Sequence, residues 1–243
     1  MKFNQHIAVS TPAVLLVPYE ACHVPRYHEW MKDPDIQELT ASEPLSLQEE
    51  FENQEEWRAS GDKLTFILCL PRRSGEHGAG AGEGKGVRVG VDDAEGRMIG
   101  DVNLFLYPDD PDSEDEPQEE QTKGGNARVF GEVDVMLAER SHRRHGHGKA
   151  AVQTLLRFLR RNLRPILAEY ASFTNQEGEV ELVRLVAKIK DKNEASKTLF
   201  AGLGFVSTGE VNYFGEVEMV LEGFGGRLPW EEGDYEELEY RAL

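Results

Sequence analysis

Basic residues are few in this chain, and that shortage argues against one large class of function. The sequence has 27 Lys and Arg against 45 Asp and Glu, so its formal net charge at pH 7 is −18. A protein that binds nucleic acid needs a basic face, because it must displace counterions from the phosphates. We therefore expect no nucleic-acid partner.

Cysteines and long apolar segments are also in short supply. Cys22 and Cys69 each stand in an apolar stretch without a second cysteine nearby, which argues against a disulfide framework and against a zinc site. No segment approaches the roughly 18 apolar residues that cross a bilayer, and residues 1–6 lack the apolar core of a signal peptide. We expect a cytoplasmic protein with two buried, reduced thiols and no membrane partner.

The acidic residues and the glycines are unevenly distributed. Residues 108–120 hold eight acids and no base, and residues 230–243 hold six acids and one Arg. Residues 71–97 contain eight glycines and few large apolar side chains. Such compositions do not fold by themselves. We expect one domain over residues 1–229, with flexible inserts near 71–97 and 108–127, followed by an acidic C-terminal tail over 230–243.

Hydrophobic periodicity predicts one mixed α/β domain. The expected strands cover residues 14–19, 65–70, 98–106, 128–138 and 182–189, with two more after residue 204. The expected helices cover residues 23–32, a segment that begins at Ser46, a segment between the glycines near 148 and Pro165, and residues 193–202. This order favours a mixed central sheet with helices on both faces.

The strongest local signal is the segment Arg140–Lys149, in which seven of ten residues are Arg, Lys or His. It lies between a predicted strand and a predicted helix. Free N–H groups at a helix start bind anions, and Gly146 and Gly148 let the backbone approach a ligand closely. The segment therefore predicts a site for a phosphate-bearing ligand. Its histidines have no nearby Cys or Glu-x-x-His partner, so we expect no metal there; they are His142, His145 and His147.

Two other phosphate loops fit this segment less well. A Walker A loop requires Ser or Thr after Gly-Lys, but the chain has Gly148-Lys149-Ala150, and Arg143 stands where that loop requires its first glycine. The Gly146-x-Gly148-x-x-Ala151 spacing satisfies a loose Rossmann pattern. However, the preceding strand carries Glu132 and Asp134 on one face, and a parallel strand covered on both faces should be almost wholly apolar.

Two motifs resemble the cofactor-binding motifs of the GNAT superfamily of acetyltransferases. Arg143-x-x-Gly146-x-Gly148 is similar to the pyrophosphate motif for acetyl-CoA, and Asn193–Phe205 is similar to the second cofactor motif. A closer resemblance is to the eukaryotic N-acetyltransferase nine group, which is related to enzymes that modify the N-termini of ribosomal proteins. It rests on residues 26–31, 39–45, 100–106, 131–139 and 187–189, and the whole resemblance covers Val14–Leu221.

The resemblance implies a GNAT-like fold and a reaction in which an amine directly attacks the thioester of acetyl-CoA. The acceptor would be a protein or peptide amine, either an N-terminus or a lysine, with cytoskeletal proteins among the candidates. The residues expected to bind the cofactor are Met136, Leu137, Ala138, Arg143, Arg144, His145, Gly146, His147, Gly148, Lys149, Asn193 and Phe200. Asn193 equally suits the role of helix N-cap.

The candidate general bases are Glu132 and Asp134, which share a strand face with Met136. We prefer Glu132, because it lies farther from the expected thioester and leaves room for the amine. The alternative interpretation is that both carboxylates lie on a solvated strand face and have no catalytic role. Many family members have Tyr near the position of Phe200, so the group that protonates the thiolate is left open. Lys188 either faces the cleft or extends its charge to solvent.

The acceptor contacts are predicted on two segments. Asp101 and Asn103 share a face of the neighbouring strand, where acidic groups attract an ammonium ion. Ser42 and Glu43 lie where the family's first helix pair covers the acceptor. A non-catalytic acyl-CoA-binding or scaffold protein is the alternative function, because no residue in the sequence by itself demonstrates turnover. The sequence does not indicate the oligomeric state.

Overall fold

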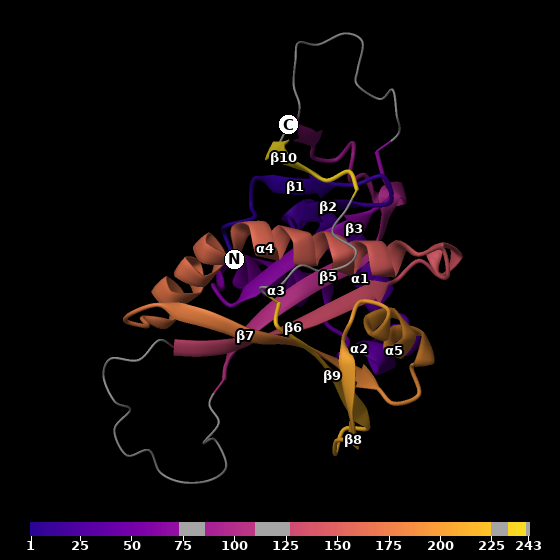
Figure 1. The fold of residues 1–243 in the computed structure, drawn as a ribbon. Helices are drawn as coiled ribbons and strands as arrows, with labels where there is room; N and C mark the ends of the chain where they lie inside the picture. Colours follow the sequence, from indigo (N-terminus) through magenta and orange to yellow (C-terminus); the bar gives the residue numbers. More distant parts are fainter. Residues whose placement is uncertain (73–85, 110–126, 225–232, 242–243) are drawn as a thin grey trace.

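The computed structural model of this chain describes residues 1–72, 86–109, 127–224 and 233–241. The described strands form one mixed sheet in the order β4-β10-β1-β2-β3-β5-β6-β7-β9-β8. Helices lie on both faces of this sheet (Figure 1), which confirms the predicted α/β class. The longest described helix is α4, which crosses the sheet (Figure 1).

The strands are β1 (Ile7–Ser10), β2 (Leu15–Pro18), β3 (Lys63–Cys69), β4 (Val87–Arg88), β5 (Met98–Pro108), β6 (Ala127–Leu137), β7 (Val180–Lys190), β8 (Val206–Val211), β9 (Glu216–Glu222) and β10 (Glu236–Arg241). The helices are α1 (Val24–Met31), α2 (Pro34–Thr40), α3 (Leu47–Ala59), α4 (His147–Thr174) and α5 (Glu194–Ala201). Three short 3₁₀ turns complete the described part: η1 (Ala21–His23), η2 (Glu95–Arg97) and η3 (Arg140–His142).

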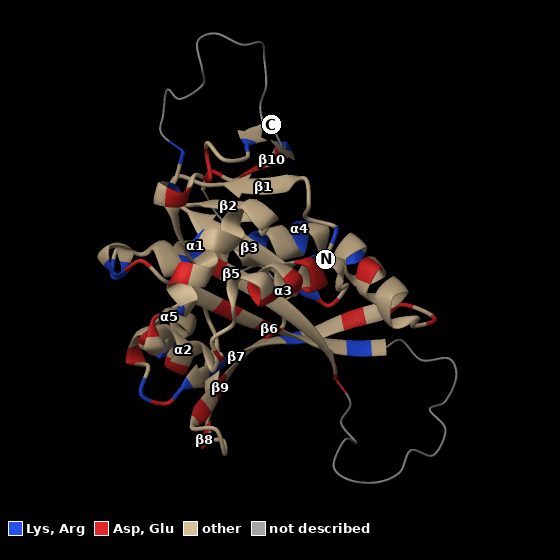
Figure 2. Cartoon of the chain, turned by 180° about the vertical axis from the view of Figure 1, so that it is seen from behind, with Lys and Arg blue, Asp and Glu red and all other residues tan. Residues whose placement is uncertain are grey.

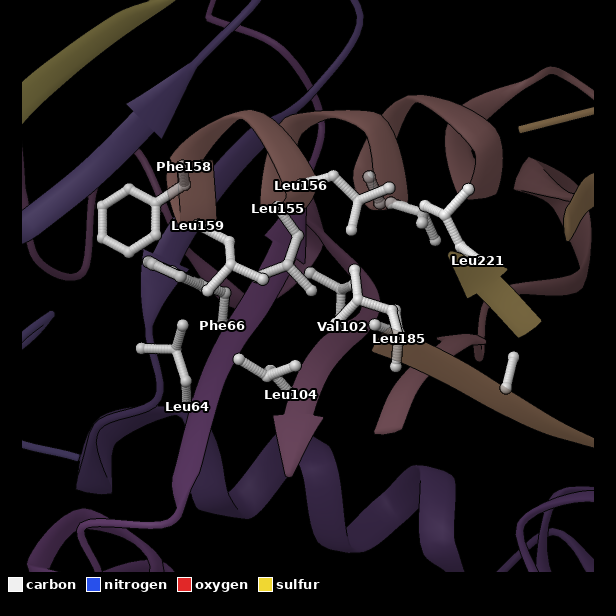
Figure 3. Close-up of a cluster of buried hydrophobic side chains, with 14 of the residues drawn as sticks. Leu64, Phe66, Val102, Leu104, Leu155, Leu156, Phe158, Leu159, Leu185 and Leu221 are labelled. Atoms are coloured by element: carbon white, nitrogen blue, oxygen red, sulfur yellow. The ribbon is translucent and has the colours of Figure 1, made fainter. Parts of the chain in front are cut away.

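The main hydrophobic core lies between α4 and one face of the sheet. Leu155 and Leu159 of α4 pack toward Phe66 of β3 and Leu104 of β5, and all four side chains are fully buried (Figure 3). Burying a side chain of this size contributes about 1.5–3 kcal/mol. Because side chains alternate along a strand, Asp101 and Asn103 of β5 face away from α4, whereas Val102 and Leu104 face it.

The helix α4 is longer than the sequence pattern indicated. We expected it to end before Pro165, but it continues to Thr174 across a kink at Asn162, whose φ and ψ are −120° and 17°. A proline ring clashes with the carbonyl group four residues earlier in an unbroken helix. The kink at Asn162 places Pro165 in the first turn of the second segment, where proline is tolerated.

The opposite face of the sheet is covered by α1, α2 and α3. The capping box predicted at Ser46 is present, because Glu49 N–H donates to Ser46 Oγ at 3.3 Å and Ser46 N–H donates to Glu49 Oε2 at 2.7 Å. The sequence analysis missed α2, although Asp33 caps it and Pro34 occupies its first turn. Proline in the first turn is a recognised start signal.

The two central parallel strands, β6 and β7, diverge along their length. Their pairing runs from Ala127 opposite Val180 to Glu132 opposite Val186. Beyond that point β6 continues to Leu137 and β7 to Lys190, and no pairing between these two described segments is present. The divergence leaves one edge of the second half of β6 without a strand partner.

Residues 236–241 are part of the sheet, contrary to our expectation of an acidic tail over 230–243. Strand β10 pairs with β1 in antiparallel register, and its Leu238 and Tyr240 are buried. The acidic side chains alternate with these apolar ones, so a segment rich in charge still has one apolar face. Strand β1 was not predicted either, and the two strands lie side by side near one edge of the sheet (Figure 1).

The predicted inserts are only partly described. Within 71–97, residues 86–97 contain β4 and η2, and Asp92 and Asp93 are buried, so this part is not a loose loop. Within 108–127, residues 110–126 lie outside the described residues. Cys69 is buried as expected, whereas Cys22 is exposed, which corrects the prediction of two buried thiols. In the described ranges, no helix has the length and apolar character needed to cross a membrane.

Candidate active site

The start of α4 offers free backbone donors. The helical ladder begins with Ala150 N–H, which donates to Gly146 O at 3.0 Å, so the N–H groups of the three preceding residues lie outside it. Gly146 caps the helix with φ of 84°, a left-handed conformation that favours glycine. The loop before α4 projects at the edge of the molecule and carries basic residues (Figure 2). The exposed members of the predicted phosphate site are Arg144, His145, Gly146 and Lys149, with His147 half-buried.

Gly148 brings the helix start close to the end of β6. It is buried, and a Cβ atom at this position would lie 3.1 Å from Leu199 Cδ1 and 3.5 Å from Leu137 Cδ1. A larger side chain would push α4 away from α5 and from β6. The second glycine of the motif is therefore explained by packing, whereas Gly146 is explained by backbone conformation.

Arg143 binds the end of β6 rather than extending into solvent. Its Nε donates to Leu137 O at 2.8 Å, and its Nη2 lies 3.4 Å from Ala138 O. The guanidinium group is half-buried there. It therefore joins the two parts of the predicted cofactor site, the unpaired edge of β6 and the loop before α4.

Strand β6 is irregular where it meets this loop. Ala138 N–H and Glu139 N–H both donate to Ile99 O, at 3.0 and 3.3 Å, so one carbonyl of the β5 segment serves two successive residues. Such a bulge bends the strand. Gly100 permits the close contact beside it, because a Cβ atom on Gly100 would lie 1.9 Å from Met136 O.

Helix α1 is anchored to this bend through Glu139. Trp30 Nε1 donates to Glu139 Oε1 at 2.7 Å, and Arg26 pairs with the same carboxylate. On the next segment, Arg140 pairs with Asp33 at 3.1 Å and with Asp35 at 2.6 Å on α2. The sequence analysis missed these contacts, because they join residues more than a hundred positions apart.

Asp134 is the most perturbed carboxylate on the face opposite α4. Burial raises its pKa to about 7, and the negative charges of Glu132 and Asp101 act in the same direction. Asp134 lies opposite Asn103 in the register of β5 and β6. At neutral pH this carboxyl is therefore poised between its protonated and ionised forms.

Glu132 has a different environment two residues earlier. Its Oε2 accepts a hydrogen bond from Lys188 Nζ at 2.7 Å, and its side chain is 13% exposed. The Lys188 ammonium also lies 5.7 Å from the ring centre of Tyr107. Lys188 thus faces the same side of the sheet as the two candidate bases, and its side chain is 38% exposed there.

Asp101 and Asn103 form a buried polar pair beside Asp134. Asp101 Oδ2 accepts hydrogen bonds from Tyr27 Oη and from Asn103 Nδ2, each at 3.1 Å. Burial raises the pKa of Asp101 to about 6, although these hydrogen bonds oppose the shift. Asn103 Oδ1 is buried and has no hydrogen-bond partner within the described ranges. Asp101 Oδ1 has none of standard geometry, but the Met136 backbone N–H still stabilises the Asp101 carboxylate. An unpartnered buried acceptor costs about 1–3 kcal/mol, so Asn103 Oδ1 could accept from a bound donor.

The remaining predicted residues lie elsewhere. Ser42 is half-buried and Glu43 exposed in the loop between α2 and α3, where Ser42 Oγ accepts a hydrogen bond from Thr40. Asn193 Oδ1 accepts from Ser196 N–H at 3.2 Å, so it caps α5. Phe200 is 3% exposed and packs on another ring of the main core. Contacts of these residues with a ligand stay predictions.

Comparison with known proteins agrees with this architecture. Residues 13–206 match the family model described as the acetyltransferase (GNAT) domain. The chain is 34% identical over 233 residues to an N-acetyltransferase 9-like protein of Schizosaccharomyces pombe, which covers 91% of this chain and 98% of the relative. It is 35% identical over 245 residues to the Homo sapiens protein named alpha/beta-tubulin-N-acetyltransferase 9, with 99% and 97% covered.

Solved structures share the fold at low sequence identity. The ribosomal L7/L12 alpha-N-protein acetyltransferase RimL, in complex with coenzyme A, superposes with a TM-score of 0.51 and 13% identity, covering 86% of this chain and 94% of that one. The aminoglycoside acetyltransferase AAC(6')-Ib in complex with coenzyme A has a TM-score of 0.51 and 17% identity, with 88% and 95% covered.

Diverging parallel strands beside a glycine-rich helix start, together with these matches, define an acetyltransferase that uses acetyl-CoA. The chain belongs to the GNAT family, and within it to the N-acetyltransferase 9-like proteins.

Proposed function

We propose that this enzyme transfers the acetyl group of acetyl-CoA directly to a protein amine, with Asp134 as the general base. The raised pKa of Asp134, about 7, is the observation that carries the proposal. A base works best when its pKa lies near the working pH. Glu132 is engaged by Lys188, so the structure favours Asp134 over Glu132, the reverse of the order expected from the sequence.

The described residues fit acetyl-CoA along two surfaces. The free N–H groups of His147, Gly148 and Lys149 suit a pyrophosphate at the helix start. The unpaired edge of β6 at Met136–Ala138 suits the amide groups of pantetheine, which would add to the sheet like a short strand. When bound there, acetyl-CoA supplies an activated thioester.

On the other side, the carboxylates would bind and deprotonate the acceptor. Asp101 and Asn103 are buried acceptors beside Asp134, and Asn103 Oδ1 has no donor in the described structure, so an acceptor ammonium group that reaches this face can donate to it. Asp134, opposite Asn103 in the register, accepts one proton from that ammonium. The neutral amine then attacks the thioester carbon; its bond to carbon forms as the carbon–sulfur bond breaks, and the remaining excess proton on nitrogen passes to the departing thiolate.

Tubulin is the first acceptor to test. Relatives from Drosophila melanogaster, Mus musculus and Homo sapiens are named alpha/beta-tubulin-N-acetyltransferase 9, at 33–35% identity. We propose that the acceptor is the N-terminal amine of such a cytoskeletal protein, which would place the enzyme in the cytoplasm. The neutral-amine requirement favours an α-amine over a lysine, because its ordinary pKa is more than two units lower.

The test compares two matched variants on two matched peptides. One peptide carries a tubulin N-terminus with a free α-amine, and the other has that amine blocked and one free lysine. We expect thiol release from acetyl-CoA with the first peptide. Asp134→Asn should lower turnover about a hundredfold to ten-thousandfold, with acetyl-CoA affinity unchanged by calorimetry.

Glu132→Gln is the control, and its turnover should fall much less. If Glu132→Gln loses turnover while Asp134→Asn keeps it, the base is Glu132. If the wild type acetylates only the lysine peptide, the proposed acceptor is wrong while the base assignment stands.

A further inference from the structure

The ion pair between Lys188 and Glu132 lies where the two central parallel strands begin to diverge. Glu132 is the last residue of β6 that pairs with β7, and its register partner is Val186. Lys188 follows Val186 by two residues, so its side chain leaves β7 on the same face of the sheet. Its Nζ donates to Glu132 Oε2 at 2.7 Å. The ion pair therefore bridges β6 and β7 at the base of the gap between them.

Lys188 stands between acidic side chains of both neighbouring strands. Glu132 lies on β6, and Glu218 of β9 is the register partner of Lys188. Burial acts to lower the pKa of Lys188, but the hydrogen bond to Glu132 and the charges of Glu132 and Glu218 outweigh it, so the pKa is raised. Lys190, the next lysine on this face of β7, pairs with Glu216 instead. The Lys188 ammonium group therefore stays charged at neutral pH and is engaged by Glu132.

Asp134 belongs to the same group of charges. The charged and titratable side chains around it come from four strands, and they are Asp101 and Tyr107 of β5, Glu132 of β6, Lys188 of β7 and Glu216 of β9. Burial is the main cause of the raised pKa of Asp134, and the neighbouring carboxylates raise it further. The positive charge of Lys188 acts in the opposite direction. Of these neighbours, Lys188 is the cation that favours the ionised form of Asp134.

We propose that Lys188 is a positioning residue for acetyl transfer. Its ammonium group holds the Glu132 carboxylate by a direct hydrogen bond and offsets its negative charge, which leaves Asp134 able to ionise and to accept the proton of the acceptor. Without this cation, the unpaired charge of Glu132 would keep Asp134 protonated to higher pH, because like charges disfavour ionisation. The inference rests on the proposed role of Asp134 as the base.

Two other roles for Lys188 fit the geometry less well. A proton donor to the departing thiolate should point into the gap between β6 and β7. The Lys188 ammonium instead lies 5.7 Å from the ring centre of Tyr107, which pairs with Phe130 on the closed side of that gap. An ion pair without function is typically exposed on the surface, whereas the Glu132 side chain is mostly buried. The position of the ammonium group therefore favours a role through Glu132.

The first measurement follows Asp134 directly, in the full chain without acetyl-CoA or acceptor. The aspartate carboxyl carbons are isotopically labelled, the Asp134 signal is assigned by its absence in Asp134→Asn, and its titration midpoint is measured by NMR. Lys188→Met should raise the midpoint by about one pH unit, the lower end of the effect of a nearby charge. Lys188→Arg should keep it near the wild-type value. Glu132→Gln should lower it, and the double variant Lys188→Met with Glu132→Gln should lie between the two single variants.

The second measurement is the pH dependence of kcat/KM for the acceptor peptide with a free α-amine. In Lys188→Met the rise should move to higher pH by the same amount as the titration midpoint, and the rate should reach the wild-type value once Asp134 is fully ionised. A purely structural defect would lower the rate at every pH. Lys197→Met on α5, which removes ion pairs to Asp191 and Glu194, is the matched control and should change neither measurement.

The outcomes separate this inference from the proposed function. An unchanged Asp134 midpoint in both Lys188→Met and Lys188→Gln, each shown to be folded by circular dichroism, would overturn the inference. A loss of rate in Lys188→Met that high pH does not restore would overturn it as well. A midpoint that moves while the rate profile stays in place would instead contradict the proposed function, because Asp134 would then titrate without acting as the base.

Discussion

The acetyl-CoA side of the candidate active site is built mostly from backbone, whereas the acceptor side is built from side chains. On the first side, helix N–H groups and the unpaired edge of β6 provide the surface, and the glycines at 100, 146 and 148 allow the backbone to adopt this arrangement. On the second, Asp134, Asp101 and Asn103 provide charge and hydrogen-bond acceptors. A backbone surface depends little on side-chain identity, whereas in our proposal the side chains determine which acceptor binds and the pH at which it reacts.

The largest expected effect concerns the charge of Asp134 and its effect on stability. Its pKa in the folded state, about 7, lies above the ordinary value of 3.8, so the folded state binds the proton more tightly. The stability that this proton provides is therefore complete below about pH 4 and is lost as the pH rises to about 7. Three pKa units correspond to roughly 4 kcal/mol.

Asp134→Asn removes this dependence. Relative to the wild type, the variant should gain stability between pH 4 and pH 8, measured by urea unfolding at each pH. Glu43→Gln, at an exposed carboxylate, serves as the control. If the difference in unfolding free energy between Asp134→Asn and the wild type were constant over this pH range, ionisation of Asp134 would not destabilise the folded state, which would contradict its raised pKa.

The next effect tests the backbone side of the comparison. In Gly100→Ala, the new Cβ would meet Met136 O at 1.9 Å, so β5 and β6 must separate. Overpacking of this kind costs about 3 kcal/mol, the upper part of the usual range. Gly96→Ala is the matched control, because nothing lies within 4 Å of its Cβ position. Equal melting temperatures for the two variants would contradict the close contact.

A smaller effect is expected at Arg143, which joins the loop to β6. Arg143→Ala removes its hydrogen bonds to Leu137 O and Ala138 O as well as a positive charge. Acetyl-CoA binding should weaken by about 1–3 kcal/mol, the range for charged hydrogen bonds. The KM for the acceptor and the pH profile should stay as in the wild type. If steady-state kinetics showed a change in the acceptor KM alone, Arg143 would contribute to acceptor binding and not to acetyl-CoA binding.

The smallest effect separates two roles of Asn193. As the N-cap of α5, its loss in Asn193→Ala should reduce the free energy of unfolding by about 1 kcal/mol. Asn193→Ser retains a capping oxygen and should recover most of that stability. If both variants also bind acetyl-CoA less tightly by calorimetry, Asn193 contacts the cofactor as well; if neither does, the cap is its whole function.

The sequence predicted the conformation of the loop before α4 better than the contacts on the opposite face, because the loop is contiguous. Arg143, Gly146 and Gly148 lie within one short segment, so their spacing indicated a helix that begins at glycine; phosphate binding there stays a prediction. Tyr27 and Asp101 are 74 positions apart, and their hydrogen bond depends on how α1 crosses the sheet. Local patterns contain no information about such contacts.

Two other predictions, the end of α4 and the acidic tail, were wrong because they relied on local sequence alone. Proline was treated as the end of α4, but the kink at Asn162 relieves the clash at Pro165 and the helix continues. The charge of the last residues suggested a tail, yet Leu238 and Tyr240 alternate with acids and bury one face of β10. In both cases tertiary packing prevailed over composition. The proposal of Asp134 over Glu132 as base likewise draws on the structure, because spacing places both on one face, whereas the raised pKa of Asp134 and the ion pair of Glu132 with Lys188 differ between them.

The most direct test of the account is the pH dependence of kcat/KM for the acceptor peptide in wild type and Glu132→Gln. In the wild type the rate should rise with pH through about 7, where Asp134 becomes ionised. Removing the Glu132 charge lowers the pKa of Asp134, since a neighbouring negative charge disfavours ionisation. The rise should therefore move to lower pH in Glu132→Gln, and Asp134→Asn should lack it. An unchanged profile in Glu132→Gln, or the same rise in Asp134→Asn, would contradict the assignment of Asp134 as the base.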